Sequence, residues 1–435
     1  MKASDRYDYT SGYVDESYRP GKHDLVMEYY TEPAEGISLR RLCDLIAGES
    51  SIGTWTHIST MNPGIAKRLK PHVYHVDEKR GVIKVAYTDE LFEWGNMPGI
   101  LSSVAGNIFG MKAVKHLRLD DIHFPQSIMR KYHGPEGGVP GIRKLTRTKD
   151  RPLTGTIVKP KVGLTAEQHA KVAYEAWSGG LDIVKDDENL VSMSFNNFDR
   201  RMQLTLKMRD KAEKETGEKK IYLANVTAET LEMLRRAKLV HRLGGEFLMI
   251  DILTAGWAGV QSLRDFGHDH KKFLHGHRAM HGAFTRDPKQ GISMLAIAKI
   301  ARLIGIDTLH IGTAAIGKMA GNKDEELAME HEIEQEHIPE DDRMHILKQD
   351  WFHIKPSMAV ASGGLHPGLI PDLIKVMGKD IVAQAGGGVH GHPDGTRAGA
   401  RAMREAVDAA MQGIPLKQYT KTHPALAKAV QKWGC

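Results

Sequence analysis

The sequence is poor in cysteine: 435 residues contain only Cys43 and Cys435. Cys43 lies in a helix-like stretch and Cys435 is the last residue, so no disulfide framework is expected and a reducing, cytoplasmic compartment is favoured. No uninterrupted apolar run approaches the roughly 20 residues that a membrane-spanning helix needs. The polar start, MKASDRYD, has no hydrophobic signal core. We therefore expect neither a membrane segment nor an export signal.

Charge of one sign is not concentrated in any segment. The 60 Lys and Arg residues and 54 Asp and Glu residues are interleaved, which leaves a formal charge of +6. No long basic tract and no platform of interleaved aromatics is present, so nucleic-acid binding is not expected. A modest positive field would still attract an anionic substrate. The apolar fraction of 41% is typical of a globular protein.

From about Gly155 onward, short β-type runs alternate with longer helical stretches. The eight runs are Gly155 to Val158, Leu181 to Val184, Ile221 to Asn225, Phe247 to Ile252, Phe273 to His275, Thr308 to Ile311, Met358 to Ala361 and Ile381 to Gln384. Thr165 with Gln168 predicts a capping box at the start of one intervening helix. Alternating strands and helices predict a parallel sheet, and eight such units over roughly 260 residues match a (β/α)8 TIM barrel.

The earlier part of the chain has a different pattern, which predicts a separate domain. We expect an N-terminal α+β domain over residues 1–145, followed by a barrel catalytic domain with a C-terminal helical tail over residues 146–435. In the first domain the sequence predicts a strand at 81–87 and helices at 38–47 and 101–107. Two further segments are expected to be irregular: a Gly- and Pro-bearing linker at 134–141 and a solvated acidic helix and loop at 324–343.

The second β-type run ends in Lys185, Asp186, Asp187 and Glu188. Carboxylates at a strand end suit Mg²⁺, which prefers oxygen ligands. A protonated lysine would repel a cation, so Lys185 fits only if it is neutral or converted to an anion by CO₂. The alternative is a solvated charge cluster. Polar residues or glycines follow nearly every other strand, and the carboxyl ends of barrel strands share one mouth, which favours a site there.

Glycine clusters follow the seventh and eighth strands, where barrels often bind phosphate. They are Ser362-Gly363-Gly364 and Gly386-Gly387-Gly388. Arg278 could hold a second phosphate, and the loop 312–318 is predicted to be a flap. A zinc site at His277 and His281 is an alternative that lacks a cysteine-containing ligand set. A metal, two anion pockets and titratable groups together indicate a sugar bisphosphate substrate.

These motifs resemble the large subunit of ribulose-1,5-bisphosphate carboxylase/oxygenase, most closely its archaeal form III branch. The likeness covers nearly the full chain. The matching segments are 156–164, 180–189, 277–281, 310–318, 362–368, 386–393, 49–55 and 106–110.

The resemblance implies a role for each matching residue. CO₂ would add to Lys185 as an activating carbamate, which would bind Mg²⁺ together with Asp187 and Glu188. The catalytic residues implied are Lys159, His277, Lys185, Lys318, Glu49, Asn107 and His281. The substrate-binding residues implied are Lys161, Arg278, His310, Ser362, Gly363, Gly364, Gln384, Gly386, Gly387, Thr54 and Trp55.

The implied activity is Mg²⁺-dependent addition of CO₂ or O₂ to the enediolate of ribulose 1,5-bisphosphate, with 3-phosphoglycerate as a product. The form III likeness favours a role in AMP or nucleoside-ribose metabolism. The family implies a homodimer, or a higher oligomer of dimers, with active sites shared between subunits and without a small subunit. Two alternatives remain: a carboxylase-like enolase or isomerase that does not capture CO₂, and a non-catalytic anion-binding barrel.

Overall fold

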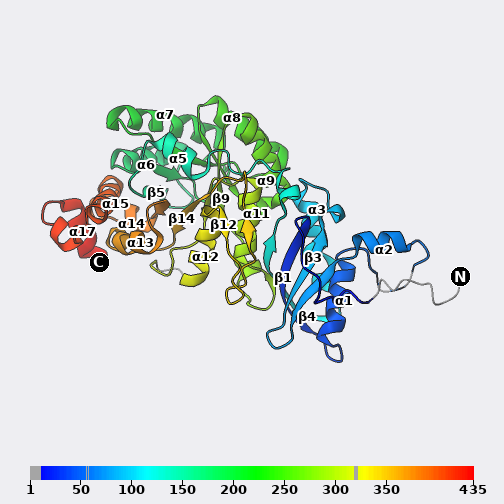
Figure 1. The fold of residues 1–435 in the computed structure, drawn as a ribbon. Helices are drawn as coiled ribbons and strands as arrows, with labels where there is room; N and C mark the ends of the chain where they lie inside the picture. Colours follow the sequence, from blue (N-terminus) through cyan, green and yellow to red (C-terminus); the bar gives the residue numbers. More distant parts are fainter. Residues whose placement is uncertain (1–10, 55, 57, 318–321) are drawn as a thin grey trace. The chain divides into compact units, whose positions relative to one another are not determined.

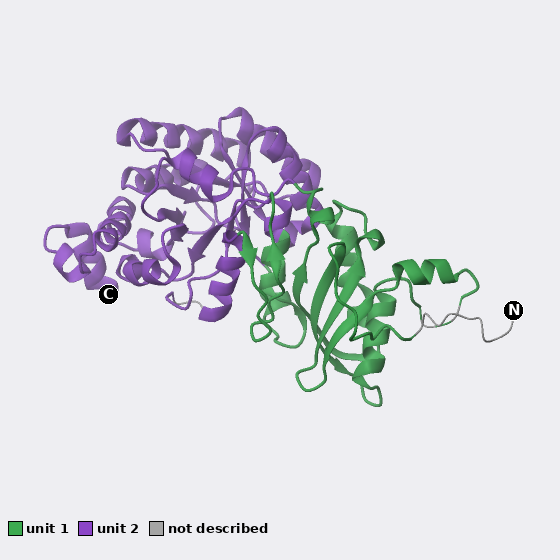
Figure 2. Ribbon diagram, in the orientation of Figure 1, with its two compact units in different colours: residues 1–132, 280–300, 336–353 green, residues 133–279, 301–335, 354–435 purple. Residues whose placement is uncertain are grey.

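The computed structural model describes residues 11–54, 56, 58–317 and 322–435 (Figure 1). Its contacts divide the chain into two compact units (Figure 2). Unit 1 comprises residues 1–132, 280–300 and 336–353, and unit 2 comprises residues 133–279, 301–335 and 354–435. Unit 1 therefore includes two segments from the second half of the sequence.

Unit 1 is built on a five-stranded sheet with strand order β10-β4-β1-β3-β2. The sheet strands are β1 (Asp24–Pro33), β2 (His72–Asp77), β3 (Val82–Thr88), β4 (Val114–His123) and β10 (Gly291–Ile292). Neighbouring strands are antiparallel except for the short β10–β4 pair. The central strand β1 is rich in apolar and aromatic residues, and its first six residues are buried. Strand β3 confirms the strand predicted at 81–87.

Short helices and a small hairpin complete unit 1. They are α1 (Leu39–Glu49), α2 (Pro63–Leu69), η2 (Asp89–Leu91), α3 (Met97–Val104), η3 (Asn107–Gly110), α4 (Gln126–Met129), α10 (Gly282–Thr285), β12 (His337–Ile338) and β13 (Gln349–Asp350). Helix α1 confirms the helix predicted at 38–47, with Ser38 as its N-cap. The helix predicted at 101–107 is displaced. It begins at Met97 because the Asn96 side chain caps it and Pro98 suits its first turn.

Unit 2 contains a closed barrel of eight parallel strands, in the order β5-β6-β7-β8-β9-β11-β14-β15. The strands are β5 (Leu153–Ile157), β6 (Ile183–Lys185), β7 (Ile221–Asn225), β8 (Phe247–Asp251), β9 (Phe273–His277), β11 (Thr308–His310), β14 (Met358–Ser362) and β15 (Ile381–Gln384). All eight predicted runs are strands, so the TIM-barrel prediction is confirmed. Apolar residues from most of these strands form one core cluster with Ile142.

The remaining helices include those that surround the barrel strands in Figure 1 and those of a C-terminal tail. They are α5 (Gly138–Thr146), α6 (Ala166–Ser178), α7 (Phe198–Thr216), α8 (Thr230–Arg242), α9 (Ile252–Asp269), α11 (Met294–Ile304), α12 (Lys323–Glu334), η4 (Pro367–Leu369), α13 (Ile370–Met377), α14 (Gly387–His390), α15 (Thr396–Met411), α16 (Leu416–Tyr419) and α17 (Pro424–Trp433). The capping box predicted for α6 is present, since Thr165 and Gln168 exchange side chain-to-backbone hydrogen bonds.

The linker predicted at 134–141 is wrong, because helix α5 begins inside it. The backbone N–H groups of Gly137 and Gly138 both donate to Oδ1 of Asp307, at 2.9 Å each. Asp307 is fully buried, and Ile142 of α5 packs in the barrel core. Glycine and proline therefore mark an ordered helix start here, with its free N–H groups satisfied by a carboxylate.

The acidic segment at 324–343 contains the predicted helix, α12, but one face of this helix is buried. Glu326, Glu330 and Glu332 are only 7%, 4% and 1% exposed. Charged residues in a sequence usually mark a solvated face. The pattern alone gives no indication that these three carboxyl groups face the protein interior.

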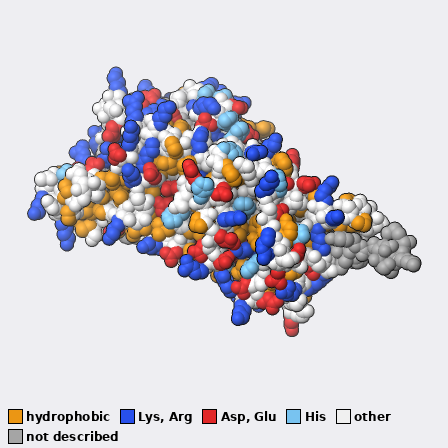
Figure 3. All heavy atoms as spheres, in the orientation of Figure 1, with side chains coloured by type: hydrophobic (Ala, Val, Ile, Leu, Met, Phe, Trp, Pro, Cys, Tyr) orange, Lys and Arg blue, Asp and Glu red, His pale blue; other side chains and the backbone are white. Residues whose placement is uncertain are grey.

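The surface agrees with the even charge distribution of the sequence. Figure 3 shows basic and acidic side chains intermingled over the face that is drawn. None of the described helices is both long and apolar enough to cross a membrane.

Candidate active site

Strand β6 ends at Lys185, whose side chain is fully buried. Its Nζ donates to the carbonyl oxygen of Asp186 at 2.8 Å and lies 3.3 Å from Oε2 of Glu188. Burial lowers the pKa of Lys185, although the charges of Glu188 and Asp187 oppose this shift. Burial outweighs the two carboxylates and therefore favours the neutral amine.

Asp187 and Glu188 face the same small region as Lys185. Oδ2 of Asp187 accepts a hydrogen bond from Nζ of Lys159 at 2.7 Å, and Oδ1 accepts from the backbone and side chain of Asn189. Burial opposes ionisation of Asp187, but these hydrogen bonds lower its pKa overall. Oε2 of Glu188 lies 3.6 Å from Nε2 of His277. The structure thus brings together five of the predicted site residues.

Asp186, between these residues, has a different environment. Its carboxylate is fully buried and lies 3.3 Å from Arg201 and 3.1 Å from His169. It also accepts from the hydroxyl of Tyr222 and from the backbone N–H of Asn225. Burial opposes ionisation, yet Arg201 and His169 lower the pKa of Asp186 to about 2. Asp186 therefore fixes the β6 end to the surrounding elements and leaves Asp187 and Glu188 for the site.

His277 ends strand β9 beside a carboxylate that was not predicted. Its Nδ1 accepts from the backbone N–H of Ala279 at 3.2 Å and lies 3.3 Å from Oδ1 of Asp251. That oxygen is buried and has no hydrogen-bond partner in the described part of the chain. The sequence placed Asp251 inside the fourth strand, but β8 ends at Asp251. A strand boundary one residue earlier would have identified it as a strand-end acid.

His310 ends strand β11 and forms a pair of buried histidines with His275. Their Nε2 atoms are 3.2 Å apart, and Nδ1 of His275 lies 2.8 Å from the hydroxyl of Thr308. Burial lowers the pKa of both imidazoles well below the ordinary value. The ring of His277 contacts His310 at a centroid distance of 4.7 Å. His275 and His310 are therefore neutral hydrogen-bonding groups.

Arg278 follows β9 and has no hydrogen-bond or ion-pair partner within the described ranges; its electrostatic neighbour is Glu326. Burial lowers its pKa. An Arg fork that is partly desolvated and lacks a carboxylate is suited to an anionic ligand. No group of three His, Cys, Asp or Glu ligands among the described residues includes His277 or His281. The zinc alternative therefore has no support from this geometry.

The glycine loops lie after β14 and β15, as predicted. Gly363 and Gly364 have φ angles of +138° and +70°, which favour glycine. A Cβ atom at Gly386 would lie 3.0 Å from Cε of Lys159, so this loop closely approaches the acidic site. Gln384 is fully buried, and neither amide atom has a hydrogen-bond partner in the described structure.

The loop after β11 is anchored by a residue that the sequence did not single out. Oε2 of Glu326, on α12, accepts from the backbone N–H of Thr313 at 2.9 Å, and the Thr313 hydroxyl accepts from Gly317 N–H at 2.9 Å. A Cβ at Gly312 would lie only 2.0 Å from the Glu326 carboxylate, which explains the glycine. Lys318, the lysine predicted for this flap, lies outside the described residues.

Several predicted residues lie in unit 1. Nδ2 of Asn107 donates to Oε1 of Glu49 at 3.4 Å. Glu49 and Thr54 line a cavity of about 230 Å³ within this unit. Nδ1 of His281 lies 3.1 Å from the Thr285 hydroxyl. Trp55 lies outside the described residues, and Lys161, which belongs to unit 2, is exposed.

Family models match both parts of the sequence. The model described as "Ribulose bisphosphate carboxylase large chain, catalytic domain" matches residues 138–433, and that described as "Ribulose bisphosphate carboxylase large chain, N-terminal domain" matches residues 12–128.

Relatives with this name are similar over their full length. A ribulose bisphosphate carboxylase from Methanosarcina acetivorans is 53% identical over 422 residues, covering 97% of this chain and 98% of the relative. One from Pyrococcus abyssi is 48% identical and covers 100% and 99%.

Solved structures of archaeal proteins share the fold. The structure titled dimeric archaeal Rubisco from Hyperthermus butylicus has a TM-score of 0.93 and 48% identity, covering 98% of this chain and 100% of that one. An octameric Rubisco from Pyrococcus horikoshii has a TM-score of 0.91 and 47% identity, covering 98% and 97%. Sequence and fold agree over nearly the whole chain, which therefore belongs to the ribulose bisphosphate carboxylase large-chain family.

Proposed function

We propose that this protein is a ribulose-1,5-bisphosphate carboxylase/oxygenase that adds CO₂ or O₂ to the enediolate of its substrate. The observation that supports this most strongly is the position of Lys185. It is a fully buried lysine at a barrel strand end, with Nζ 3.3 Å from Glu188 and with Asp187 held nearby by Lys159. The relatives that bear the carboxylase name agree with this proposal.

The donor set fits Mg²⁺ once Lys185 is modified. The neutral amine attacks CO₂ and releases a proton, so that the nitrogen becomes a carbamate with anionic oxygen atoms. These oxygens and those of Asp187 and Glu188 are the ligand type that Mg²⁺ prefers. Mg²⁺ held by these three groups would supply Lewis-acid stabilisation of charge on substrate oxygens. Without the carbamate, the proposed ligand set is reduced to the carboxylates of Asp187 and Glu188.

Protein groups then move the protons. A carbamate oxygen of Lys185 takes the C3 proton of ribulose bisphosphate, which gives the enediolate. Lys159 serves as acid and base near C2, and its Nζ lies 2.7 Å from Oδ2 of the proposed ligand Asp187. His277 takes part in the later proton transfers. The backbone N–H of Ala279 and the nearby Asp251 orient its ring. CO₂ adds to the enediolate, water adds to the resulting ketone, and cleavage of the C2–C3 bond gives two molecules of 3-phosphoglycerate.

Two anion pockets hold the phosphates. Arg278, His310 and Ser362 form the first, where the Arg278 guanidinium, which has no ion-pair partner among the described residues, supplies the charge. The second comprises Gly363, Gly364, Gly386 and Gly387, whose backbone N–H groups are suited to phosphate oxygens. We assign Gln384 and Lys161 as further substrate-binding residues at the same barrel mouth.

The remaining assignments concern assembly and pathway. Glu49, Thr54 and Asn107 would act on the barrel of a partner subunit, so the minimal unit would be a dimer. The dimeric and octameric archaeal neighbours support an assembly of this kind. Assignment to form III, a role in AMP or nucleoside-ribose metabolism and a domain boundary near residue 145 stay predictions.

Incorporation of labelled bicarbonate into acid-stable product tests the reaction. With ribulose bisphosphate, Mg²⁺ and no oxygen, we expect labelled 3-phosphoglycerate. An enolase or isomerase of the same fold would consume or exchange substrate without fixing label, and that outcome would contradict the proposal.

A pair of buried lysines provides a matched control. Lys185→Met should abolish fixation while the barrel stays folded, as judged by circular dichroism. Lys220→Met removes another fully buried lysine, at the start of β7 and thus at the opposite end of the barrel strands, and should retain fixation. A non-catalytic anion-binding barrel predicts no difference between the two variants.

A further inference from the structure

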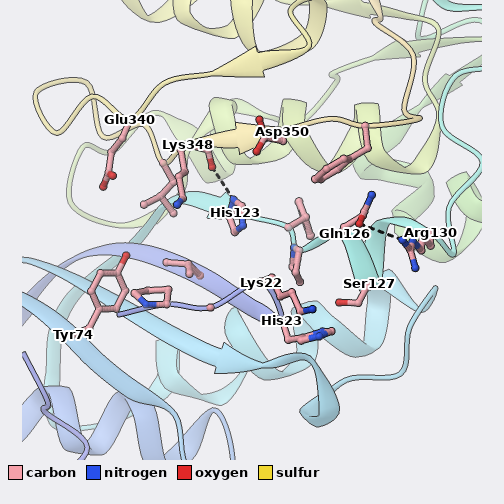
Figure 4. Close-up of a pocket in the computed structure, with 17 residues that line it drawn as sticks. Lys22, His23, Tyr74, His123, Gln126, Ser127, Arg130, Glu340, Lys348 and Asp350 are labelled. Atoms are coloured by element: carbon pink, nitrogen blue, oxygen red, sulfur yellow. Dashed lines mark hydrogen bonds between the residues drawn. The ribbon is translucent and has the colours of Figure 1, made fainter. Parts of the chain in front are cut away.

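Unit 1 contains an elongated groove that the proposed reaction does not use. Its volume is about 550 Å³, within the range of roughly 300–1,000 Å³ typical of small-molecule sites. Figure 4 shows it between two segments that face each other, 20–26 before and within β1 and 340–352 around β13, with α4 at one end. All 17 lining residues belong to unit 1.

One wall of the groove is fixed by the buried carboxylate of Asp89. Oδ2 of Asp89 lies 3.0 Å from Nδ1 of His23 and accepts from the hydroxyl of Ser127. Its backbone oxygen accepts from the indole of Trp94 at 2.9 Å. His23 and Ser127 both line the groove, so a single buried group positions residues from two chain segments.

The opposite wall is fixed by side chain-to-backbone bonds. The Gln349 amide accepts from Phe124 N–H at 2.8 Å and donates to Phe124 O at 3.1 Å. Nδ1 of His123 lies 2.7 Å from the carbonyl oxygen of Lys348 (Figure 4). A groove whose walls are tied in this way exists before any ligand arrives, which lowers the entropy cost of binding.

The charges that line the groove are unbalanced. Lys22, Arg130 and Lys348 have no carboxylate partner in the part of the chain that the structure describes. Of the two lining acids, Glu340 shares Lys84 with Glu28 and Asp342, and Asp350 lies 2.7 Å from Nδ1 of His337. The lining therefore carries three cations and two carboxylates, which leaves a net positive charge.

Aromatic rings supply the apolar part of the lining. Tyr74 is partly exposed and Phe352 is 54% exposed, whereas Phe124 is fully buried behind the lining. Aromatic side chains of this kind supply apolar contact area in small-molecule sites. Burial lowers the pKa of His123 to about 4, so its imidazole is neutral. With Nδ1 donating to Lys348 O, Nε2 is left as an acceptor for a ligand hydroxyl or N–H group.

We propose that this groove binds a small organic anion whose negative group is attached to a flat apolar ring system. The ring would contact Tyr74 and Phe352, and the anion would be attracted by Lys348 and Arg130, which lie on different sides of the groove in Figure 4. The cavity volume, the fixed walls and the net positive charge of the lining support this ligand class together. The proposal does not depend on the carboxylase reaction, since none of these residues has a part in it.

Two fluorescent probes with nearly the same rings test the proposal on the full-length protein. They are 8-anilinonaphthalene-1-sulfonate, an anion, and N-phenyl-1-naphthylamine, which lacks the sulfonate. We expect saturable binding of the anion and clearly weaker binding of the neutral probe. Equal affinity for both probes would show hydrophobic adsorption alone and would overturn the proposal.

Substitutions in the groove lining test whether the probe binds there. We expect the double variant Lys348→Glu, Arg130→Glu to bind the anion about tenfold or more weakly, because charge-assisted hydrogen bonds to the ligand are lost. Phe352→Asn should also weaken binding, because asparagine tolerates the φ of +49° at this position but removes the ring.

The control is Lys207→Glu, the same charge change on an exposed position of α7 in unit 2. It should leave affinity unchanged, and Lys185→Met should do the same, which separates the groove from the barrel mouth. All groove variants should keep wild-type carboxylation. The proposal fails if the groove variants and Lys207→Glu bind the anion equally well.

Discussion

At the scale of single residues, neighbours in the sequence have sharply different environments. Lys185, Asp186, Asp187 and Glu188 are consecutive, yet Asp186 contacts Arg201 and His169 while the other three face the proposed site. The residue pattern predicted a metal site from this run, but only the family resemblance singled out Asp187 and Glu188 as the ligands. The distinction depends on Arg201 and His169, whose helices are folded against β6 from elsewhere in the chain.

Removing the structural acid should destabilise the barrel strongly. Asp186→Ala leaves the fully buried Arg201 without its charge partner, which should cost about 3–5 kcal/mol in the free energy of unfolding. Asp199→Ala is the control, because its ion pair with Arg235 is nearly half exposed and should contribute less than about 1 kcal/mol. Urea unfolding measures both. Similar losses for the two variants would show that Asp186 is not a structural anchor.

At the scale of elements, periodicity identified the barrel because each strand is a short apolar run ended by polar residues. All eight runs are strands, and the glycine loops follow the seventh and eighth. Where a prediction from the sequence was wrong, a residue far away in the chain determines the local structure. Asp307 stabilises the start of α5 within a glycine-rich stretch. The buried face of α12 likewise depends on tertiary packing, which charge patterning does not report.

Helix α12 should weaken at high pH. Burial raises the pKa of Glu330 from an ordinary 4.5 to about 8, and burial together with the charge of Glu330 does the same for Glu334. The folded state therefore retains protons that the unfolded state releases, so stability falls as pH rises from about 4.5 through 8. Hydrogen exchange in α12, corrected for intrinsic rates, should be faster at pH 9 than at pH 6.

Two substitutions on α12 test whether the buried carboxyl group of Glu330 causes this pH dependence. Glu330→Gln keeps the shape of a neutral carboxyl group and should remove much of the pH dependence. Glu325→Gln alters an exposed position of α12 and should leave the dependence unchanged. Identical pH profiles for wild type and Glu330→Gln would refute the assignment.

At the scale of the whole molecule, the candidate residues are divided between the two units. Glu49, Thr54 and Asn107 belong to unit 1, whereas Lys185, Asp187 and Glu188 belong to unit 2. The motifs of both units were recognised in the sequence through a family resemblance. Composition and periodicity alone gave no reason to connect Asn107 with a barrel mouth.

Mixing two inactive variants tests whether sites are shared between subunits. We expect Lys185→Met and Asn107→Ala each to be inactive alone and to regain activity when they are co-expressed. Random pairing makes about half of the dimers mixed, and one of the two sites in each mixed dimer carries neither change, so about a quarter of wild-type activity should return. No recovery, with mixed dimers demonstrated by mass spectrometry, would mean that each site lies within one chain.

The central claim is that Lys185 becomes a carbamate and completes a magnesium site. A crystal structure obtained with Mg²⁺ and bicarbonate tests it most directly. We predict continuous density for a carboxylate group beyond Nζ of Lys185, with a cation between that group, Asp187 and Glu188. A bare amine at Lys185 under those conditions, with the two carboxylates turned elsewhere, would contradict the claim.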